Sequence, residues 1–251
     1  MLLDGKVAIV TGGGRGLGAC ICRVLASHGA RVAVVYGHSA DAAARVVAEI
    51  EAAGGEAAAF AADVRNQAAV EAMVEAVVAH FGRLDAVVNN AIAGNQNGSL
   101  LGADWQDFED MLDFGVRQIY NTVRAAHPHL KAAGGGRIVN IVTELWNLAP
   151  PGWATYLAGK GAMVGISRSL AGELGPDGIT VNMVAPGWMQ DEKVDPESEG
   201  SKAYGAALPL RHHGSGDEIG KGVAFFLSDL ASYVTGAYLP VTGGRITQLG
   251  A

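Results

Sequence analysis

Seven short apolar runs alternate with segments of helical periodicity along almost the whole chain. The runs are rich in Val, Ala, Ile and Leu and predict buried strands at residues 6–11, 31–36, 56–63, 84–91, 137–143, 180–186 and 237–241. Between them, apolar spacing predicts helices over residues 17–28, 41–53, 67–81, 104–132, 153–174 and 216–229. This repetition predicts an α/β fold: a Rossmann-type, doubly wound parallel sheet of seven strands, with helices on both faces in three layers.

The segment from Trp188 to Pro209 departs from this pattern, because it is polar, charged and poorly periodic. A loop of that length inside a compact domain is usually functional, for example as a lid, or else partly disordered. We therefore expect residues 188–210 to form a substrate loop or lid. No linker, repeat or low-complexity stretch interrupts the rest, so we expect residues 1–251 to form a single domain.

Composition and charge narrow the class of protein. Hydrophobic residues make up 49% and aromatic residues only 6%, which suits a parallel sheet packed between Ala-rich helices. The net charge of −7 argues against a nucleic-acid partner or an anionic membrane surface. Cys20 and Cys22 lie two residues apart in a predicted helix and face different ways, which favours reduced thiols. With no leader-like or membrane-spanning stretch, we expect a soluble, cytoplasmic protein.

The turn from Thr11 to Gly18 follows the first predicted strand and opens the first helix. Glycines at 12, 16 and 18 allow a tight turn, close approach of a phosphate and packing of the helix on the sheet. The helix N-terminus adds free N–H groups and the positive end of a dipole. The turn therefore predicts a site for the pyrophosphate of a dinucleotide; the alternative is a tight structural turn without a ligand.

The end of the second predicted strand bears on which dinucleotide binds. An acidic residue there binds the ribose hydroxyls of NAD, but this chain has Tyr36, Gly37, His38 and Ser39. Nothing at this point repels a 2′-phosphate, and Arg15, Ser39 and His38 are within the expected reach of one. We therefore expect NADP(H) rather than NAD(H). For His38 the alternative is a solvated loop residue.

Three residues carry a candidate chemistry. Tyr156 and Lys160 lie four apart early in a predicted helix, so they share one face. A nearby cation is expected to lower the pKa of the phenol from about 10, which makes Tyr156 a candidate general acid/base. Thr143 ends the fifth predicted strand, where its hydroxyl is placed to bond a substrate carbonyl oxygen.

Together these motifs resemble the short-chain dehydrogenase/reductase family of about 250 residues, and the match runs from Gly5 to Gly244. Its elements occur in order: the glycine turn at 11–18, Asp63-Val64, Asn89-Asn90-Ala91, Tyr156-x-x-x-Lys160, Pro186-Gly187 and Gly243-Gly244. Within the family the chain is most like the reductases of 3-oxoacyl thioesters or of ketones in general.

The resemblance implies where a cofactor lies. Lys160 is expected to bind the nicotinamide ribose hydroxyls, and Asp63-Val64 the adenine. The backbone of residues 89–91 and 186–189 is expected to line the cofactor. The full set of expected cofactor-binding residues is Gly12, Gly14, Arg15, Gly16, Leu17, Gly18, Tyr36, His38, Ser39, Asp63, Val64, Asn89, Asn90, Ala91, Tyr156, Lys160, Pro186, Gly187 and Met189.

The chain departs from the family pattern at catalytic positions. Thr143 stands where the family usually has Ser, and it keeps the hydroxyl while adding a methyl group. Gly115 stands where the family has an Asn that supports a kinked helix, whose backbone carbonyl holds a water in a proton relay. Glycine retains that carbonyl and permits a kink, at a helix cost of about 1 kcal/mol. We therefore count Gly115 with Tyr156, Lys160 and Thr143 as a candidate catalytic position.

Further departures concern the walls of the site. Asp191 replaces a Thr that contacts the nicotinamide carboxamide, and it is either an acceptor for that group or a solvated carboxylate. After Ala91 the chain reads Ile92-Ala93-Gly94, which alters the pocket wall. Glu144 is interpreted as a solvated turn residue. The aromatic residues expected near the substrate, although some of them simply pack in the core, are Trp146, Trp153, Trp188 and Tyr204.

The sequence thus favours an NADP(H)-dependent oxidoreductase that interconverts a carbonyl and a secondary alcohol by hydride transfer. The alternative, motivated by Gly115, Thr143 and Asp191, is a dinucleotide-binding protein with weak or no turnover, acting as a sensor or in assembly. No metal site is expected, because the His pairs at 127–129 and 212–213 lack ligand partners at suitable spacing. The resemblance also implies a small-molecule substrate, no nucleic-acid or membrane partner, and a homotetramer or homodimer.

Overall fold

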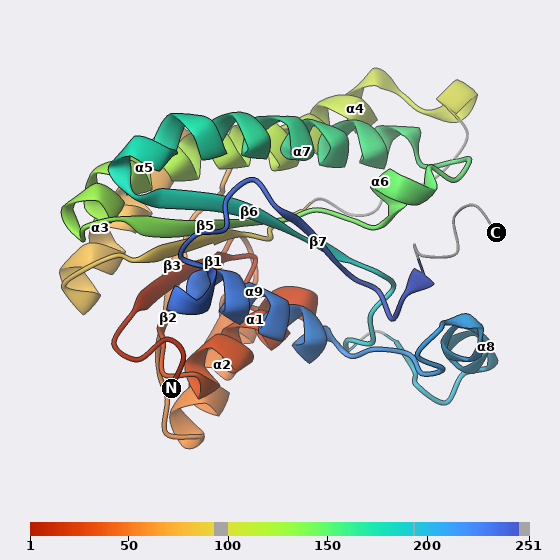
Figure 1. Ribbon diagram of the computed structural model, residues 1–251, viewed down its shortest axis with the longest axis horizontal. Helices are drawn as coiled ribbons and strands as arrows, with labels where there is room; N and C mark the ends of the chain where they lie inside the picture. Colours follow the sequence, from red (N-terminus) through yellow and green to blue (C-terminus); the bar gives the residue numbers. More distant parts are fainter. Residues whose placement is uncertain (93–99, 193, 246–251) are drawn as a thin grey trace.

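A single parallel sheet runs through the protein, in strand order β3-β2-β1-β4-β5-β6-β7 (Figure 1). The computed structural model describes residues 1–92, 100–192 and 194–245. Every strand pair in it is parallel. The strands are β1 (Val7–Thr11), β2 (Arg31–Tyr36), β3 (Glu56–Ala61), β4 (Ala86–Asn89), β5 (Gly136–Ile141), β6 (Ile179–Pro186) and β7 (Tyr238–Val241). The predicted seven-stranded, doubly wound sheet is confirmed.

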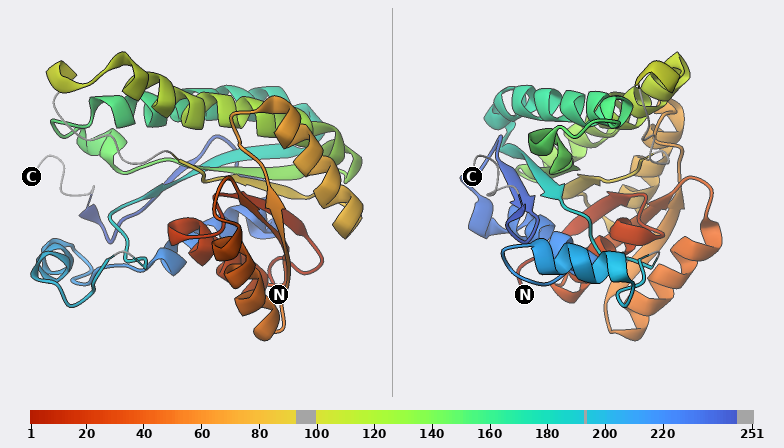
Figure 2. Two further views of the ribbon diagram at one scale, coloured as in Figure 1. Left: turned by 180° about the vertical axis from the view of Figure 1, so that it is seen from behind. Right: turned by 90° about the vertical axis from the view of Figure 1, so that its right-hand side faces the viewer.

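Helices cover both faces of the sheet and bury a separate apolar core on each (Figures 1 and 2). Alternation along the strands divides the side chains: Val7 and Ile9 enter one core, and Ala8 and Val10 the other. One face carries α1 (Gly16–Ser27), α2 (Ala40–Ala52) and α9 (Gly216–Leu227). The other carries α3 (Gln67–Phe81), α4 (Trp105–Leu112), α5 (Gln118–Ala132) and α7 (Ala154–Leu174).

The helix expected over residues 104–132 is interrupted. A π-helical turn, η2 (Asp113–Arg117), separates α4 from α5. Gly115 lies buried in that turn, and a Cβ atom there would come within 2.7 Å of the carbonyl oxygen of Gly159 on α7. The π-turn and α7 therefore approach each other more closely than any side chain at position 115 would allow.

The carboxyl ends of β1, β4, β5 and β6 lie at one edge of the sheet, and the strand order changes direction between the neighbouring strands β1 and β4. In doubly wound folds this edge holds the ligand. Two helices border it that the apolar pattern does not predict, α6 (Leu145–Leu148) and α8 (Glu199–Ala207). Within the described residues, no helix is long and apolar enough to span a membrane, and Cys20 and Cys22 are both free and buried.

Candidate active site

The glycine turn between β1 and α1 has the shape of a phosphate cradle. Gly12 and Gly16 adopt φ values of +64° and +53°, which favour glycine. A Cβ atom on Gly18 would overlap the carbonyl oxygen of Gly12, and one on Gly14 would lie 3.0 Å from a backbone nitrogen of α2. Leu17 packs on the core below, while Arg15 is exposed. The turn thus presents bare backbone at the start of α1.

A carboxylate already lies at this turn. The backbone N–H of Gly16 donates to both carboxylate oxygens of Glu192, at 2.7 and 2.8 Å. These oxygens stand in for the phosphate oxygens that a helix N-terminus binds. Because the turn accepts an anion and has no room for further side chains, it fits the pyrophosphate of a dinucleotide.

The segment after β4 fixes the turn from one side. The hydroxyl of Thr11 accepts the backbone N–H groups of Asn90 and Ala91, at 2.9 and 3.0 Å. The Asn90 side chain donates to the carbonyl oxygen of Thr11 at 2.9 Å. The Asn89 side chain instead points into the sheet, where it donates to Asn140 at 2.8 Å. Asn90 and Ala91 therefore border the turn, whereas Asn89 supports the strand beneath it.

The ends of β2 and β3 bring Tyr36, His38 and Asp63 to the other side of the turn. Tyr36 is half-buried against the core, while His38 is exposed. The pKa of Asp63 is lowered, chiefly by hydrogen bonds from the side chain of Arg65. The nearby His38 makes a smaller contribution in the same direction. Ser39 precedes α2, and Val64 is buried with its carbonyl bonded by Asn121.

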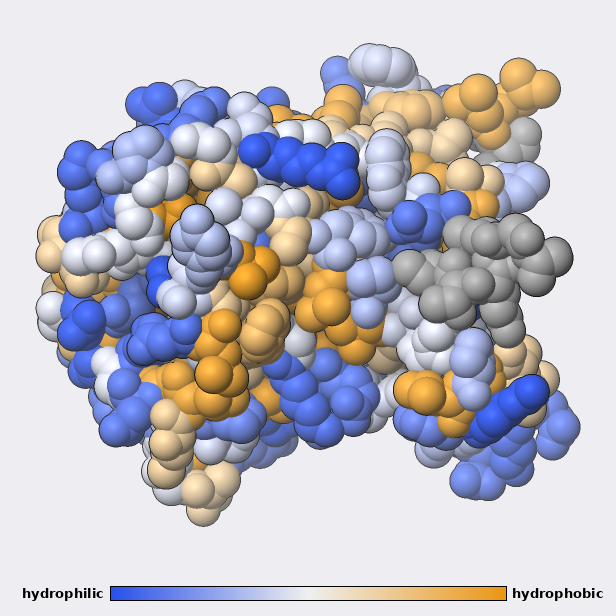
Figure 3. Space-filling view, viewed as in Figure 1, coloured by the Kyte–Doolittle hydropathy of each residue, from blue (hydrophilic) through white to orange (hydrophobic). Residues whose placement is uncertain are grey.

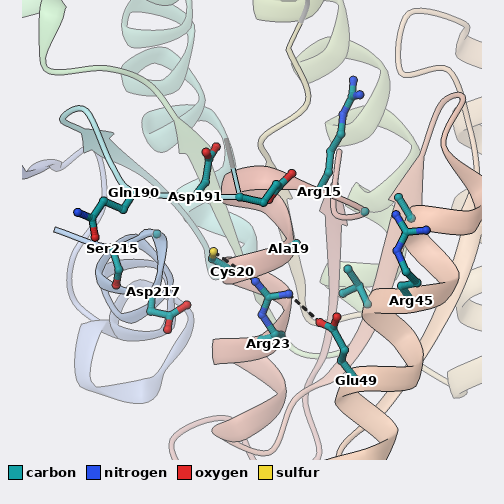
Figure 4. Close-up of a pocket in the computed structure, with 15 residues that line it drawn as sticks. Arg15, Ala19, Cys20, Arg23, Arg45, Glu49, Gln190, Asp191, Ser215 and Asp217 are labelled. Atoms are coloured by element: carbon teal, nitrogen blue, oxygen red, sulfur yellow. Dashed lines mark hydrogen bonds and ion pairs between the residues drawn. The ribbon is translucent and has the colours of Figure 1, made fainter. Parts of the chain in front are cut away.

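Beside the glycine turn lies a cavity of about 470 Å³ (Figure 4). Its walls come from α1, α2 and the segments 190–192 and 215–217. Arg23 faces it in an ion pair with Glu49, while Arg45 approaches from α2. The cavity carries charges of both signs, because Asp191 and Asp217 line its opposite wall.

The candidate catalytic residues converge where β5 meets α7. Thr143, two residues beyond the end of β5, has a side chain that hydrogen-bonds the hydroxyl of Tyr156. The ammonium nitrogen of Lys160 lies 5.9 Å from the Tyr156 ring centre and donates to the carbonyl oxygen of Ile141 at 2.6 Å. The helical spacing of four therefore places the phenol and the amine at one end of the strand, as expected.

The expected lowering of the Tyr156 pKa is wrong for this geometry. Desolvation raises the pKa of Tyr156, although its bond to Thr143 acts in the opposite direction. Burial also lowers the pKa of Lys160 to about 7, so the amine is a weaker cation than its sequence implies. Both shifts have one cause, since removal of water disfavours the charged form of each group. The neutral phenol, which is the proton-donating form, is stabilised.

Glu144 is buried, which contradicts its interpretation as a solvated turn residue. One carboxylate oxygen accepts from the guanidinium of Arg245 at 2.8 Å, and that guanidinium lies over the ring of Tyr204. The other oxygen has no protein partner among the described residues. Burial raises the pKa of Glu144 against the opposing charge of Arg245. The backbone N–H of Glu144 donates to the carbonyl oxygen of Pro186, at the end of the adjacent strand β6.

Replacing Glu144 with Ala is expected to reduce the free energy of unfolding by about 1–2 kcal/mol, because the charge-assisted bond to Arg245 is lost. Urea denaturation measures this difference. Glu197→Ala is the matched control, since its pair with Lys202 is exposed, and it should cost less than about 0.5 kcal/mol. Equal stabilities of the Glu144→Ala variant and the original protein would show that the buried pair contributes nothing.

The segment beyond β6 is tied down by an aromatic cluster. The Trp188 ring lies 5.1 Å from that of Tyr204 and 4.7 Å from that of His213. His213 bonds both the Ser201 hydroxyl, at 2.6 Å, and the carbonyl of Trp188, at 2.7 Å. Described parts of residues 188–210 are therefore ordered around α8. Nothing in the sequence pattern signals His213 or Ser201.

The other expected residues fall in different places. Trp153 packs on Tyr156 with ring centres 5.5 Å apart, while Trp146 packs on Gly161 of α7. Asp191 has a carboxylate oxygen beside Gly16, which places it at the phosphate turn. Gly187 bonds β7 through its N–H, and Met189 packs against the core.

The altered wall at Ala93-Gly94 lies outside the described residues. Within those residues, no group of three His, Cys, Asp or Glu side chains is placed to hold a metal ion.

Comparison with known proteins gives consistent matches over nearly the whole chain. A family model described as enoyl-(acyl carrier protein) reductase matches residues 12–245. The chain is 38% identical to the 3-oxoacyl-[acyl-carrier-protein] reductase FabG of Staphylococcus aureus, covering 95% of this chain and 97% of that protein.

Solved structures show the same resemblance. A short-chain dehydrogenase from Burkholderia cenocepacia in complex with NADP has a TM-score of 0.88 and 38% identity. A blue fluorescent protein from a metagenomic library, in complex with NADPH, has a TM-score of 0.86 and 39% identity. In each case the match covers 97% of this chain and 99% of the other.

Proposed function

Because the chain belongs to the short-chain dehydrogenase/reductase family, and is therefore an oxidoreductase, we propose that it reduces a ketone with NADPH. The observation that carries this proposal is the meeting of Thr143, Tyr156 and Lys160 at the sheet edge that also carries the glycine turn. The test is consumption of NADPH in the presence of a panel of ketones, including 3-oxoacyl thioesters. Such thioesters are suggested by the name of the Staphylococcus aureus relative.

The site residues have distinct roles in this reaction. NADPH, when bound, would supply the hydride. The hydroxyl of Thr143 orients the carbonyl oxygen, and the hydroxyl of Tyr156, already bonded to Thr143, gives that oxygen a proton. The raised pKa of Tyr156 keeps this proton in place before reaction. Lys160, which donates to the carbonyl oxygen of Ile141 in the same site, would bind the nicotinamide ribose.

We propose NADP(H) as the cofactor, supported by the missing carboxylate after β2 and by the two solved relatives bound to NADP or NADPH. Gly12, Gly14, Gly16, Gly18 and the segments at 89–91 and 186–189 would hold it. The exposed guanidinium of Arg15 would meet the 2′-phosphate, with His38 and Ser39 nearby.

Replacing Arg15 with Ala is expected to raise the Kd for NADPH about tenfold, which corresponds to one charge-assisted hydrogen bond of about 1.4 kcal/mol. The Kd for NADH should change by less than about twofold, because NADH lacks the 2′-phosphate. Fluorescence titration with each dinucleotide measures the two Kd values. Arg23→Ala removes the same charge from the same cavity and is the control. Equal weakening of both dinucleotides by Arg15→Ala would contradict the assignment.

Replacing Glu192 with Gln is expected to tighten NADPH binding. The carboxylate occupies the N–H of Gly16 that the pyrophosphate needs, so cofactor and side chain compete. Loss of one charge at a helix N-terminus is worth about 0.3–1 kcal/mol, or a roughly twofold to fivefold lower Kd. Glu197→Gln, which makes the same charge change in an exposed part of the loop, should leave the Kd unaltered. Weaker binding by the Glu192 variant would exclude competition.

We propose that residues 188–210 form the substrate lid, since this segment packs over Glu144 through Tyr204. Arg245, which pairs with the buried carboxylate of Glu144 and lies over the ring of Tyr204, strengthens this contact between the lid and the end of β5. Trp188 and Tyr204, whose rings are in contact within the lid, would offer an apolar surface to the substrate.

We also propose a homotetramer or homodimer. The edge strand β7 is only half-buried, and Phe225 of α9 is partly exposed. Figure 3 shows apolar side chains gathered on this face. An unpaired strand edge with apolar neighbours favours pairing with a second copy. Light scattering in solution measures the mass of the assembly.

A further inference from the structure

Gln118 is fully buried at the start of α5, between the phosphate turn and the catalytic helix. A buried carboxamide must find partners for one acceptor and two donors, or its burial is costly. Gln118 finds all three, and each partner belongs to a different segment of the site.

The first partner lies in the π-helical turn. The backbone N–H of Gln118 bonds the carbonyl of Asp113, five residues back, as a π-turn requires. In an α-helix that N–H would bond Phe114 instead. The side chain of Gln118 takes its place, donating to the carbonyl oxygen of Phe114 at 2.7 Å. Gln118 therefore makes the π-turn hydrogen bond with its backbone, and its side chain satisfies the Phe114 carbonyl that this backbone N–H no longer bonds.

The other two partners lie at the phosphate turn. The Gln118 carbonyl oxygen accepts the hydroxyl of Thr11 at 2.6 Å, and its amide donates to the carbonyl of Ala91 at 3.0 Å. The same Thr11 oxygen accepts the N–H groups of Asn90 and Ala91. The Thr11 hydroxyl donates to Gln118 at 2.6 Å and, over a longer 3.3 Å, faces the carbonyl oxygen of Val88, so its lone pairs remain available for these two N–H donors.

The π-turn also lies against α7, the helix that carries Tyr156 and Lys160. Gly115 packs on the carbonyl of Gly159, the residue before Lys160. Gly115 has no side chain with which to hold this turn. We propose that Gln118 is a positioning residue for the reductase reaction, which supports the π-turn at Gly115 and ties it to the end of β1. The predicted effect of Gln118 on kcat rests on the proposed function. Its predicted support of the π-helical turn does not depend on that function.

The discriminating variant is Gln118→Glu. A carboxylate still accepts from Thr11 but cannot donate to Ala91 or Phe114, whereas a protonated carboxyl regains one donor. Burial raises the pKa of such a group into the range of the assay. Relative to the original protein, kcat should fall at least about tenfold at pH 8 and recover at pH 6. The KM for the ketone should change by less than about threefold.

Gln118→Met, of similar length but without polar atoms, should lose kcat equally at both pH values. In both variants, amide hydrogen exchange of residues 113–118 and of Asn90 and Ala91 should accelerate at least about tenfold at pH 8, with or without NADPH. Asn182→Ala is the control: it removes a buried carboxamide that bonds Val234 and Ala237 far from the site. It should lower the melting temperature without changing the pH dependence or exchange at 113–118.

Wild-type kcat and exchange in Gln118→Glu at pH 8 would overturn the proposal. So would a loss of kcat in that variant that is equal at pH 6 and pH 8, since this indicates a general structural defect. If Gln118→Glu does not fold, exchange and kcat of Gln118→Met decide. If the original protein shows no turnover, the proposed function fails, and unaltered exchange at 113–118 in the variants is then the result that overturns the role of Gln118.

Discussion

Replacing Tyr156 with Phe is expected to lower kcat for NADPH-dependent ketone reduction by about 10³-fold or more, within the range for loss of a general acid. The variant loses only the hydroxyl that bonds Thr143, and its ring keeps the contact with Trp153. The Kd for NADPH should therefore stay within about twofold of its original value. Initial rates and fluorescence titration measure the two quantities.

Tyr233→Phe is the matched control, because Tyr233 is fully exposed and far in sequence from the site. It should leave both quantities unchanged. Undiminished turnover by Tyr156→Phe would exclude Tyr156 as the proton donor. Equal loss of NADPH binding and turnover would instead assign the residue to cofactor binding.

The stability of the cofactor-free protein is expected to rise with pH because of Lys160. The pKa of this amine is about 7 in the folded protein, against 10.5 for the free side chain. Between these values the unfolded chain binds more protons than the folded one, so the free energy of unfolding increases with pH. The slope is about 1 kcal/mol per pH unit, which gives about 2 kcal/mol between pH 7 and pH 9.

Lys160→Met isolates this contribution, because Met is of similar length and does not titrate. The difference in free energy of unfolding between the original protein and this variant should grow by about 2 kcal/mol over that range. Urea denaturation at pH 7, 8 and 9 measures it. A difference that stays constant would show that Lys160 remains charged in the folded protein, and that its bond to Ile141 compensates for burial.

Much of the fold follows from the apolar pattern, because a parallel sheet covered on both faces makes its strands continuous apolar runs. The predicted parallel, doubly wound sheet of seven strands is confirmed. The apolar pattern does not predict elements whose position depends on packing rather than on periodicity. The π-turn at Gly115 depends on its approach to Gly159, and α8 stands away from the sheet without an apolar stripe to mark it.

The candidate site divides in the same way. Thr143, Tyr156 and Lys160 could be predicted, since helical spacing and strand ends determine where they lie. Glu144 and Gln118 could not, because a polar residue looks the same in a sequence whether it is solvated or buried with partners. Their partners, Arg245 and Thr11, lie about 100 residues away along the chain. The direction of the pKa shift at Tyr156 could not be predicted from the sequence either, because it depends on how far the phenol is removed from water.

Transfer of deuterium from the reactive face of the nicotinamide ring tests the reductase assignment most directly. The protein is incubated with NADPH that carries deuterium at both positions on C4 of the nicotinamide and with a panel of ketones and 3-oxoacyl thioesters, and the products are analysed by mass spectrometry. The account predicts a secondary alcohol that carries the label on its carbinol carbon, formed about 10³-fold or more slowly by Tyr156→Phe. Tight NADPH binding without labelled alcohol from any member of the panel would contradict it and favour a dinucleotide-binding role without turnover.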